Sequence, residues 1–198
     1  ERAGLPYTGS GPDGSRAAFD KKRTKRALER AGLPTAPYEI LSAGSRRSLP
    51  LPAVVKPPRQ GSSLGLSIVR REEDWEPALR EAARYGAEVL VESYIEGREL
   101  TVGVVDGVVL PAVEIRAPGG TYDYRAKYVD HGTEYLVPAD LEAPIADEAG
   151  RLALRTFEAL GCFGFGRVDF RLDSAGRLFI LELNSIPGFT ETSLLPKA

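Results

Sequence analysis

The sequence has little sulfur and little histidine, with one cysteine, one histidine and no methionine among its 198 residues. A single cysteine, Cys162, cannot form an internal disulfide, which fits a reducing compartment. Its apolar neighbours Phe163 and Phe165 predict a packed small side chain rather than a nucleophile. Because His131 is the only histidine, neither a histidine-cluster metal site nor a histidine-based triad is expected.

Long apolar runs and an excess of one charge are also missing. No run approaches the ~20 apolar residues that cross a bilayer, and no signal peptide is recognised. The formal net charge of −2 gives no reason to expect nucleic acid or an acidic membrane as a partner. A hydrophobic content of 42% with 27% charged residues is typical of a globular protein with a full core. We therefore expect a cytoplasmic protein.

The segment 167–188, RVDFRLDSAGRLFILELNSIPG, predicts two strands joined by a turn at residues 173–176. Side chains two apart share a face of a strand. The expected apolar face is Val168, Phe170 and Leu172 with Phe179, Leu181 and Leu183, leaving Ile180 on the polar face.

The polar face of this hairpin carries candidate metal ligands. If the turn pairs Leu172 with Arg177, Asp169 and Glu182 become diagonal neighbours with Cβ atoms roughly 7 Å apart. Two carboxylates that close repel each other unless a cation lies between them, and Asn184 adds an amide oxygen. Such oxygen ligands suit Mg²⁺. The alternative is a solvated strand face.

Two features favour the metal site over a solvated face. The opposite face of the hairpin is strongly apolar, and Arg167 enters on the carboxylate side. There, opposite Glu182 in this register, its guanidinium could stabilise a phosphoryl group during transfer.

The remaining pattern predicts helices alternating with strands. The predicted helices are 15–31, 72–85 and 145–160; the predicted strands are 53–56, 66–69, 88–91, 98–105 and 108–115, with a hairpin turn at Asp106–Gly107. Residues 6–14 predict a turn-rich linker. The two ends of the sequence resemble interior segments, so we expect a fragment of a longer chain.

Lys56 ends a buried strand and is followed by the loop 57–65, PPRQGSSLG. A lysine there can reach phosphate, and the loop N–H groups with the hydroxyls of Ser62 and Ser63 supply donors. A flexible loop without a ligand is the alternative, because no G-x-x-x-x-G-K-[ST] motif is present. The basic run 21–26 predicts a solvated helix face unless a second argument selects one lysine.

Two further segments could contact a ligand. The connection 92–97 lies between two strands and can offer backbone groups to a purine edge. The polar loop 116–134 carries Tyr122, Lys127 and Tyr128 and predicts a lid.

Six segments, in order and spacing, resemble the D-alanine–D-alanine ligases of the ATP-grasp superfamily: VVKPPRQGSSLG, VLVESYIEGRELTV, YDYRAKY, GFGRVDF, LELNSIPG and TSLLP. The resemblance covers essentially the whole chain. It implies an α+β ATP-grasp fold, in which two α/β subdomains with mostly antiparallel sheets clasp the nucleotide. Residues 1–14 would link to an N-terminal domain, 15–99 would form the small central subdomain, and 100–198 the C-terminal subdomain with the metal and substrate site.

The resemblance implies a site for ATP and two Mg²⁺ ions, which Mn²⁺ could replace. The implied metal ligands are Asp169, Glu182 and Asn184. The implied phosphate ligands are Lys21, Lys56 and Lys127. The implied adenine hinge is Glu92, Ser93 and Ile95, with Glu99 for the ribose and Ser63 and Tyr122 completing the nucleotide set.

The same resemblance implies roles at the reacting groups. Arg167 and the backbone N–H of Gly188 would stabilise the tetrahedral intermediate. Ser193 and the backbone at Leu194 would bind the second D-alanine, and Ser62 and Tyr128 would close the lid over the first. Tyr128 favours an amine acceptor, but the family pattern is broken at Ser185-Ile186, Phe189 and Glu191-Thr192, so the acceptor stays open.

The implied function is ATP-dependent joining of two D-alanines through an acyl phosphate, in the synthesis of peptidoglycan precursor. Turnover by this chain alone is not implied, because the first-substrate domain is expected outside it. Two alternatives stay open: another ATP-grasp ligase joining a different carboxylate and amine, and a nucleotide-binding module without turnover. The expected small-molecule partner is D-alanine, and a homodimer of the full-length protein stays open.

Overall fold

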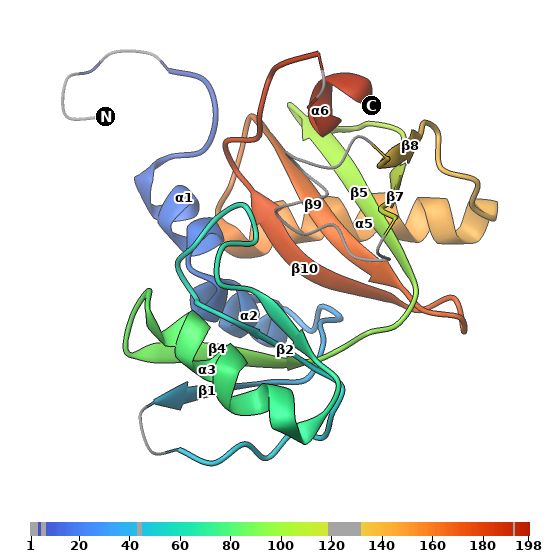
Figure 1. Ribbon diagram of the computed structural model, residues 1–198. Helices are drawn as coiled ribbons and strands as arrows, with labels where there is room; N and C mark the ends of the chain where they lie inside the picture. The colour runs from blue at the N-terminus through green and yellow to red at the C-terminus, as the bar shows by residue number, and fades with distance from the viewer. Residues whose placement is uncertain (1–3, 5–6, 43–44, 119–131, 192) are drawn as a thin grey trace.

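The computed structural model describes residues 4, 7–42, 45–118, 132–191 and 193–198. Its strands form two antiparallel sheets, and Figure 1 shows them side by side, each with helices on one face. The helical segments are α1 (Pro12–Phe19), α2 (Lys21–Arg30), the 3-10 helix η1 (Glu72–Asp74), α3 (Trp75–Ala83), α5 (Ala143–Leu160) and α6 (Leu194–Lys197). The α+β class with mostly antiparallel sheets is therefore confirmed.

The smaller sheet has the strand order β1-β4-β2-β3. Its strands are β1 (Tyr38–Ser42), β2 (Ala53–Lys56), β3 (Ser67–Val69) and β4 (Glu88–Ser93). Helix α3 covers one face, where Trp75, Ala78 and Ala82 pack against Val55 and Val91 of the central strands. The helix predicted at 72–85 is thus present as η1 and α3, and the inward positions predicted for Trp75 and Ala82 are confirmed, with Leu79 partly buried. The inward position predicted for Ala83 is wrong, because Ala83 is exposed and Ala78 is buried instead.

The larger sheet has the order β10-β9-β5-β7-β8, with β6 pairing β5. Its strands are β5 (Arg98–Val105), β6 (Val108–Val109), β7 (Val113–Arg116), β8 (Glu134–Leu136), β9 (Phe165–Leu172) and β10 (Leu178–Asn184). The predicted hairpin turn is confirmed, since Asp106 and Gly107 both have positive φ. Helix α5 packs on this sheet and ends at Gly161, whose φ of 64° is the left-handed conformation common after helices.

The helix predicted at 15–31 is two helices, because Asp20 interrupts it. The Asp20 carboxylate accepts hydrogen bonds from the N–H groups of Lys22 and Arg23 and so caps α2. Helix α1 already begins at Pro12, so the linker predicted through residue 14 is too long. The predicted subdomain 15–99 groups these helices with the smaller sheet, whereas their buried apolar side chains join the larger core: Ala18, Ala27 and Leu28.

The predicted register of the hairpin is wrong by one residue, and the prediction did not include the β-bulge that the structure has. Leu172 pairs with Leu178 rather than Arg177, and a β-bulge at Leu181 then brings Glu182 directly opposite Asp169. Without the extra residue, this one-residue shift would turn Glu182 to the other face of the sheet.

The bulge also changes which side chains of β10 face the core. Leu178 and Ile180 are inward before it and Leu183 after it, so the expected inward positions of Phe179 and Leu181 are wrong. Leu181 instead lines the space between the sheets next to Glu182.

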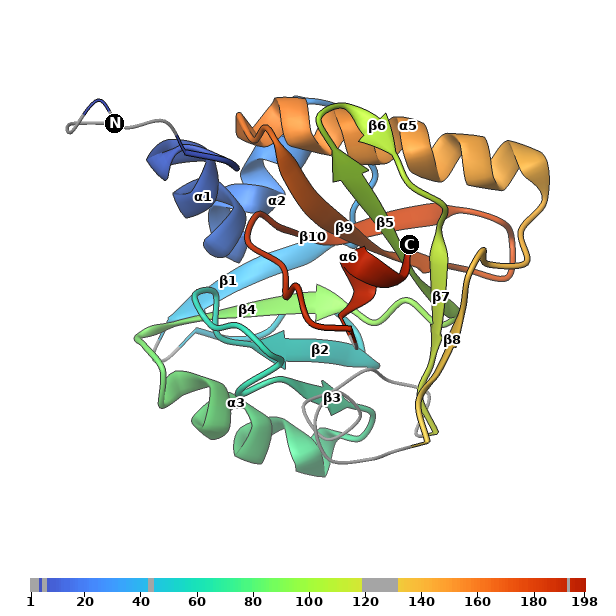
Figure 2. The ribbon, with the colours of Figure 1, turned by 90° about the horizontal axis from the view of Figure 1, so that it is seen from above.

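The two sheets face each other, with α3 and α5 on their outer sides (Figure 2). A parallel bridge between Thr35 and Ile180 joins the segment before β1 to β10. Within the described residues, no helix combines the length and apolarity needed to cross a membrane.

Cys162 is buried in the larger core, where burial raises the pKa of its thiol. The prediction that it packs as a small hydrophobic side chain is confirmed.

Candidate nucleotide and metal site

A cleft lies between the two sheets, and its volume is about 920 Å³ when the space at its open mouth is included. One wall comes from the smaller sheet and carries Lys56, while the other comes from the larger sheet and carries Asp169 and Glu182. The cleft brings together residues more than 100 positions apart in the sequence.

Asp169 and Glu182 lie at the centre of this cleft. Their Cα atoms are paired across β9 and β10, and directly opposite residues have Cβ atoms about 4.5–5.5 Å apart. They are therefore closer than the predicted diagonal arrangement. The prediction that both carboxylates share one face of the hairpin is confirmed.

Asp169 is held in place from three sides. Its carboxylate accepts hydrogen bonds from the Arg167 Nε at 2.8 Å, the Thr101 hydroxyl at 2.6 Å and the Asn184 amide at 3.0 Å. Across the strands, Arg167 pairs with Asn184. The predicted pairing of Arg167 with Glu182 came from the wrong register. The three predicted metal ligands are thus brought together.

The donor set fits a hard divalent cation. Within the described residues, no group of three or more His, Cys, Asp and Glu side chains could hold a metal, so this site relies on two carboxylates and one amide. Oxygen ligands of this kind suit Mg²⁺. In this structure Glu182 is ion-paired with Lys21, whose ammonium is 3.0 Å from the carboxylate.

Lys56 reaches the cleft from the smaller sheet, opposite Asp169, whereas Lys21 reaches it from α2, beside Glu182. Lys21, at the start of α2, also donates to the carbonyl of Gln60 at 2.7 Å, which ties α2 to the loop 57–65. In that loop Ser62 and Ser63 have φ of 52° and 57°, a conformation rare outside glycine. The loop thus lies beside both lysines, and its role in phosphate binding stays a prediction.

Glu92 is bound by two lysines, one of which the sequence did not single out. Its carboxylate is 2% exposed and contacts the ammonium groups of Lys25 and Lys56. Burial alone would raise the pKa of Glu92, but the two cations outweigh it and lower the pKa to about 2. Burial lowers the pKa of Lys25, against the attraction of Glu92.

These two shifts predict the pH dependence of stability. For both groups the folded state binds fewer protons than the unfolded state, so the free energy of unfolding rises with pH. The part due to Glu92 is complete above its ordinary pKa of 4.5 and is lost as pH falls toward 2. We expect urea unfolding at pH 6, 4 and 3 to show this loss. The double variant Lys25→Met/Glu92→Gln should lose less over the same range; equal losses in both proteins would contradict the assignment.

The wall near β4 and β5 holds the predicted base and ribose residues. The N–H of Ser93 donates to the Pro37 carbonyl at 2.9 Å, so that donor is used inside the protein. Ile95 and Glu99 line the cleft, and Arg171 binds Glu99 at 3.0 Å. The roles of Glu92, Ser93 and Ile95 at adenine and of Glu99 at ribose stay predictions.

The predicted acceptor residues lie in the segment after β10. A Cβ on Gly188 would be 2.6 Å from the Ser193 hydroxyl oxygen, so a side chain there would displace this hydroxyl. The Ser193 hydroxyl accepts from the Thr190 N–H at 3.1 Å, and the Leu194 side chain is buried against Val113. Only the backbone of Leu194 is thus suited to a ligand. The structure places these residues, and their roles stay predictions.

Three predicted residues lie outside the described part of the chain: Tyr122, Lys127 and Tyr128. The lid prediction for 116–134 falls largely on the same residues. Four other residues that the predicted sets omit contribute to the site: Lys25, Thr101, Arg171 and Leu181. A threonine or arginine within a strand carries no local signal for these roles.

Comparison with known structures defines the class. The chain superposes on a D-Ala:D-Ser ligase from Enterococcus faecalis with a TM-score of 0.88 and 30% identity, covering 98% of this chain and 60% of that one. It matches a D-alanine–D-alanine ligase from Bacillus anthracis with a TM-score of 0.86 and 33% identity, covering 99% and 66%. The chain has the ATP-grasp fold.

The family follows from sequence. The family model described as "D-ala D-ala ligase C-terminus" matches residues 27–198. A D-alanine–D-alanine ligase from Citrifermentans bemidjiense is 46% identical over the whole of this chain and 65% of its own length, and one from Bordetella petrii is 45% identical over 64% of its length. The chain belongs to the D-alanine–D-alanine ligase family. It spans about 65% of the length of these curated relatives.

Proposed function

We propose that this chain carries the nucleotide, metal and acceptor sites of an ATP-dependent ligase that joins D-alanine to a second D-amino acid. The observation that carries the proposal is the cleft, where Lys56 lies opposite Asp169 and Glu182, and Lys21 lies beside Glu182. Cations for phosphate next to oxygens for Mg²⁺ suit Mg·ATP. A solved relative from Bacillus anthracis, with a TM-score of 0.82, is a complex with ATP.

The reaction needs the carboxylate of the first D-alanine to be activated. Its oxygen takes the γ-phosphoryl group as the bond to ADP breaks, and the amine of the second substrate then attacks the acyl carbon and releases phosphate. Bound Mg²⁺ would supply positive charge to the phosphates and would be held by Asp169, Glu182 and Asn184. Lys21 and Lys56 would bind the phosphates, and Arg167 and the N–H of Gly188 would stabilise the oxyanion.

The remaining parts of the proposal concern the whole protein. Such a ligase would work in the cytoplasm on D-alanine and would supply peptidoglycan precursor. The two subdomains proposed at 15–99 and 100–198 would clasp the nucleotide, with the helices 12–30 packed on the second. Ser62 and Tyr128 would close the lid over the first D-alanine, and Ser63, Tyr122 and Lys127 would complete the nucleotide site.

Calorimetric titration of Mg·ATP into this chain tests the first part of the proposal. Binding with Mg²⁺ and weaker binding with EDTA would support it, whereas no binding under either condition would contradict it. D-alanine-dependent phosphate release by the full-length protein then separates a ligase from a nucleotide-binding module. D-serine should be tested as a second acceptor, since one of the superposed structures is a D-Ala:D-Ser ligase.

We expect Leu181→Ala to weaken adenosine binding about five- to tenfold. The bulge turns Leu181 into the cleft, where three carbon atoms of apolar contact with a base would be lost, and each contributes up to about 0.8 kcal/mol. Stability should change little, because Leu181 lies outside the buried core. The measurement is an adenosine titration. Unchanged adenosine affinity in a variant that still binds ATP would place the base elsewhere.

A further inference from the structure

A buried ion cluster lies behind the phosphate side of the cleft. It consists of Lys25, Glu92 and Lys56, from α2, β4 and β2. Lys25 is 1% exposed and Glu92 is 2% exposed, and charged groups so fully buried are rare unless they are paired. The two lysines bind different oxygens of the Glu92 carboxylate.

The cluster has two cations for one anion. Lys56 lines the cleft, whereas Lys25 lies behind Glu92, outside the described lining, where it also donates to the Thr35 hydroxyl at 2.5 Å. The cluster itself thus has one more cation than anions in a nearly dry site, and Glu29 is a further carboxylate that attracts Lys25. Burying an excess charge is costly unless an opposite charge can approach it. The side open to such an approach is the cleft, at Lys56.

We propose that Lys25 is a positioning residue for phosphate binding: by holding one oxygen of Glu92, it leaves the charge of Lys56 available to an anionic group in the cleft. Lys25 touches no ligand itself in this arrangement. The inference deepens the proposed function and rests on it, because the anionic group is the phosphate chain of a nucleotide.

Helix geometry explains how α2 can serve both sides of the site. Lys21 and Lys25 are four residues apart, so they lie on the same face of α2, one turn from each other. The first reaches Glu182 and the second reaches Glu92. If Lys25 were neutral, Glu92 and Lys56 would form a one-to-one buried pair. A phosphate would then have to compete with that carboxylate for Lys56.

The test compares Lys25→Met with Lys22→Met by titration with ATP and with adenosine. Lys22 is on the same helix and loses a more exposed ion pair, with Glu88 at 2.5 Å, and it lies away from the cluster. Lys25→Met should weaken ATP binding roughly ten- to a hundredfold, while adenosine binding changes less than about twofold. Lys22→Met should change neither. A merely structural role of Lys25 would weaken both ligands equally, and that result would overturn the inference.

The double variant Lys25→Met/Glu92→Gln provides a rescue test. Removing the carboxylate charge frees Lys56 again, so ATP should bind more tightly than to Lys25→Met alone. No recovery in a folded double variant would overturn the inference. If Lys25→Met does not fold, the ratio of ATP affinity to adenosine affinity in the neutral double variant decides the question, because a loss at the adenine hinge through Glu92 weakens both ligands equally. An unchanged ratio supports the inference, and a lower ratio opposes it. Failure of the unchanged chain to bind ATP would instead reject the proposed function.

Discussion

Glu182→Gln should reduce metal-dependent turnover of the full-length protein by about 100- to 1,000-fold, the range seen when one group that stabilises transition-state charge is removed. The substitution keeps the volume of the side chain and removes its charge. Glu182 is partly exposed in the cleft and lies directly opposite Asp169, so the hairpin pairing should not change. The ion pair with Lys21 would be lost together with the metal ligand.

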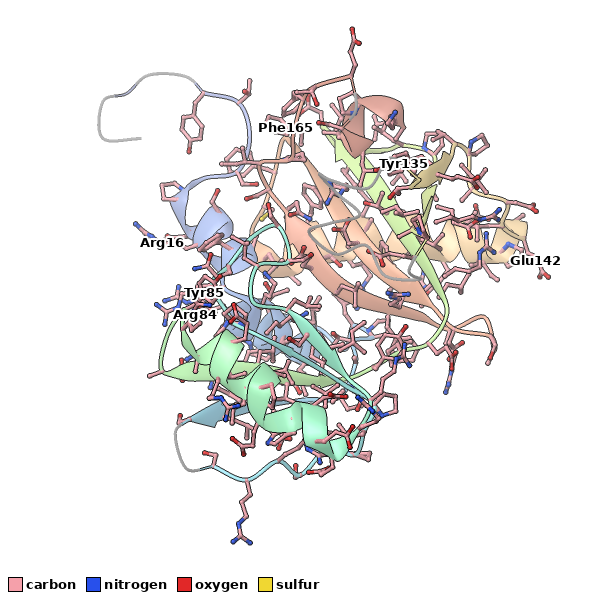
Figure 3. All side chains as sticks on the ribbon, in the orientation of Figure 1. Arg16, Arg84, Tyr85, Tyr135, Glu142 and Phe165 are labelled. Carbon is pink, nitrogen blue, oxygen red and sulfur yellow. The ribbon has the colours of Figure 1, made fainter. Side chains whose placement is uncertain are left out.

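The measurement is a Mg²⁺ titration of phosphate release, with ATP binding to the chain measured in parallel. Glu142→Gln is the matched control, because Glu142 is exposed at the start of α5, at the far end of that helix from the cleft (Figure 3). It should keep full activity and the same Mg²⁺ requirement. If Glu182→Gln kept both as well, the hairpin would not hold the metal.

The hairpin shows how far local sequence determines this site. Alternation of apolar and polar residues was enough to place Asp169 and Glu182 on one face, and that prediction is confirmed. The reason given for it was wrong, because the register depends on the turn. Here the Asp173 side chain accepts from the N–H groups of Ala175 and Arg177, which closes a tight turn and pairs Leu172 with Leu178.

The bulge at Leu181 was not predictable from alternation. A run of Phe179, Ile180, Leu181 and Leu183 offers apolar residues in both phases, so the pattern cannot say where the phase changes. Packing determines where the phase changes: Ile180 is fully buried, and its carbonyl oxygen accepts a hydrogen bond from the Thr35 hydroxyl. Contacts between distant segments therefore select the register.

The burial of Lys25 could not be predicted from the local sequence either, for a different reason. Lys25 lies in the run KKRTKR, and this pattern predicts that every basic residue lies on a solvated helix face. Only the fold brings Glu92 and Thr35 to it. The resemblance of segments to a family selected Lys21 and Lys56, which do reach the cleft, but it gave no sign of the residue behind them. Long-range ion pairs need the tertiary structure.

Phe170→Ala should lower the free energy of unfolding by about 3–5 kcal/mol, a large share of the about 5–15 kcal/mol that stabilises most domains. Phe170 is fully buried at the centre of the larger core, and its Cα is paired with those of Leu100 and Ile180 on the two neighbouring strands. Truncation would leave a cavity that three rigid strands cannot close. The preceding residue in the chain is Asp169, so the same cavity would loosen the wall that carries the metal ligands.

Urea unfolding of this chain measures the loss, with Phe19→Ala as the control. Phe19 is 56% exposed at the end of α1, so its truncation should change stability by no more than about 0.5 kcal/mol. ATP binding by Phe170→Ala, measured where the variant is still folded, should weaken more than in the control, because the position of Asp169 depends on the packing beneath it. A loss of stability no larger than that of Phe19→Ala would mean that the core can collapse around the missing ring, and that the hairpin is held mainly by its backbone hydrogen bonds.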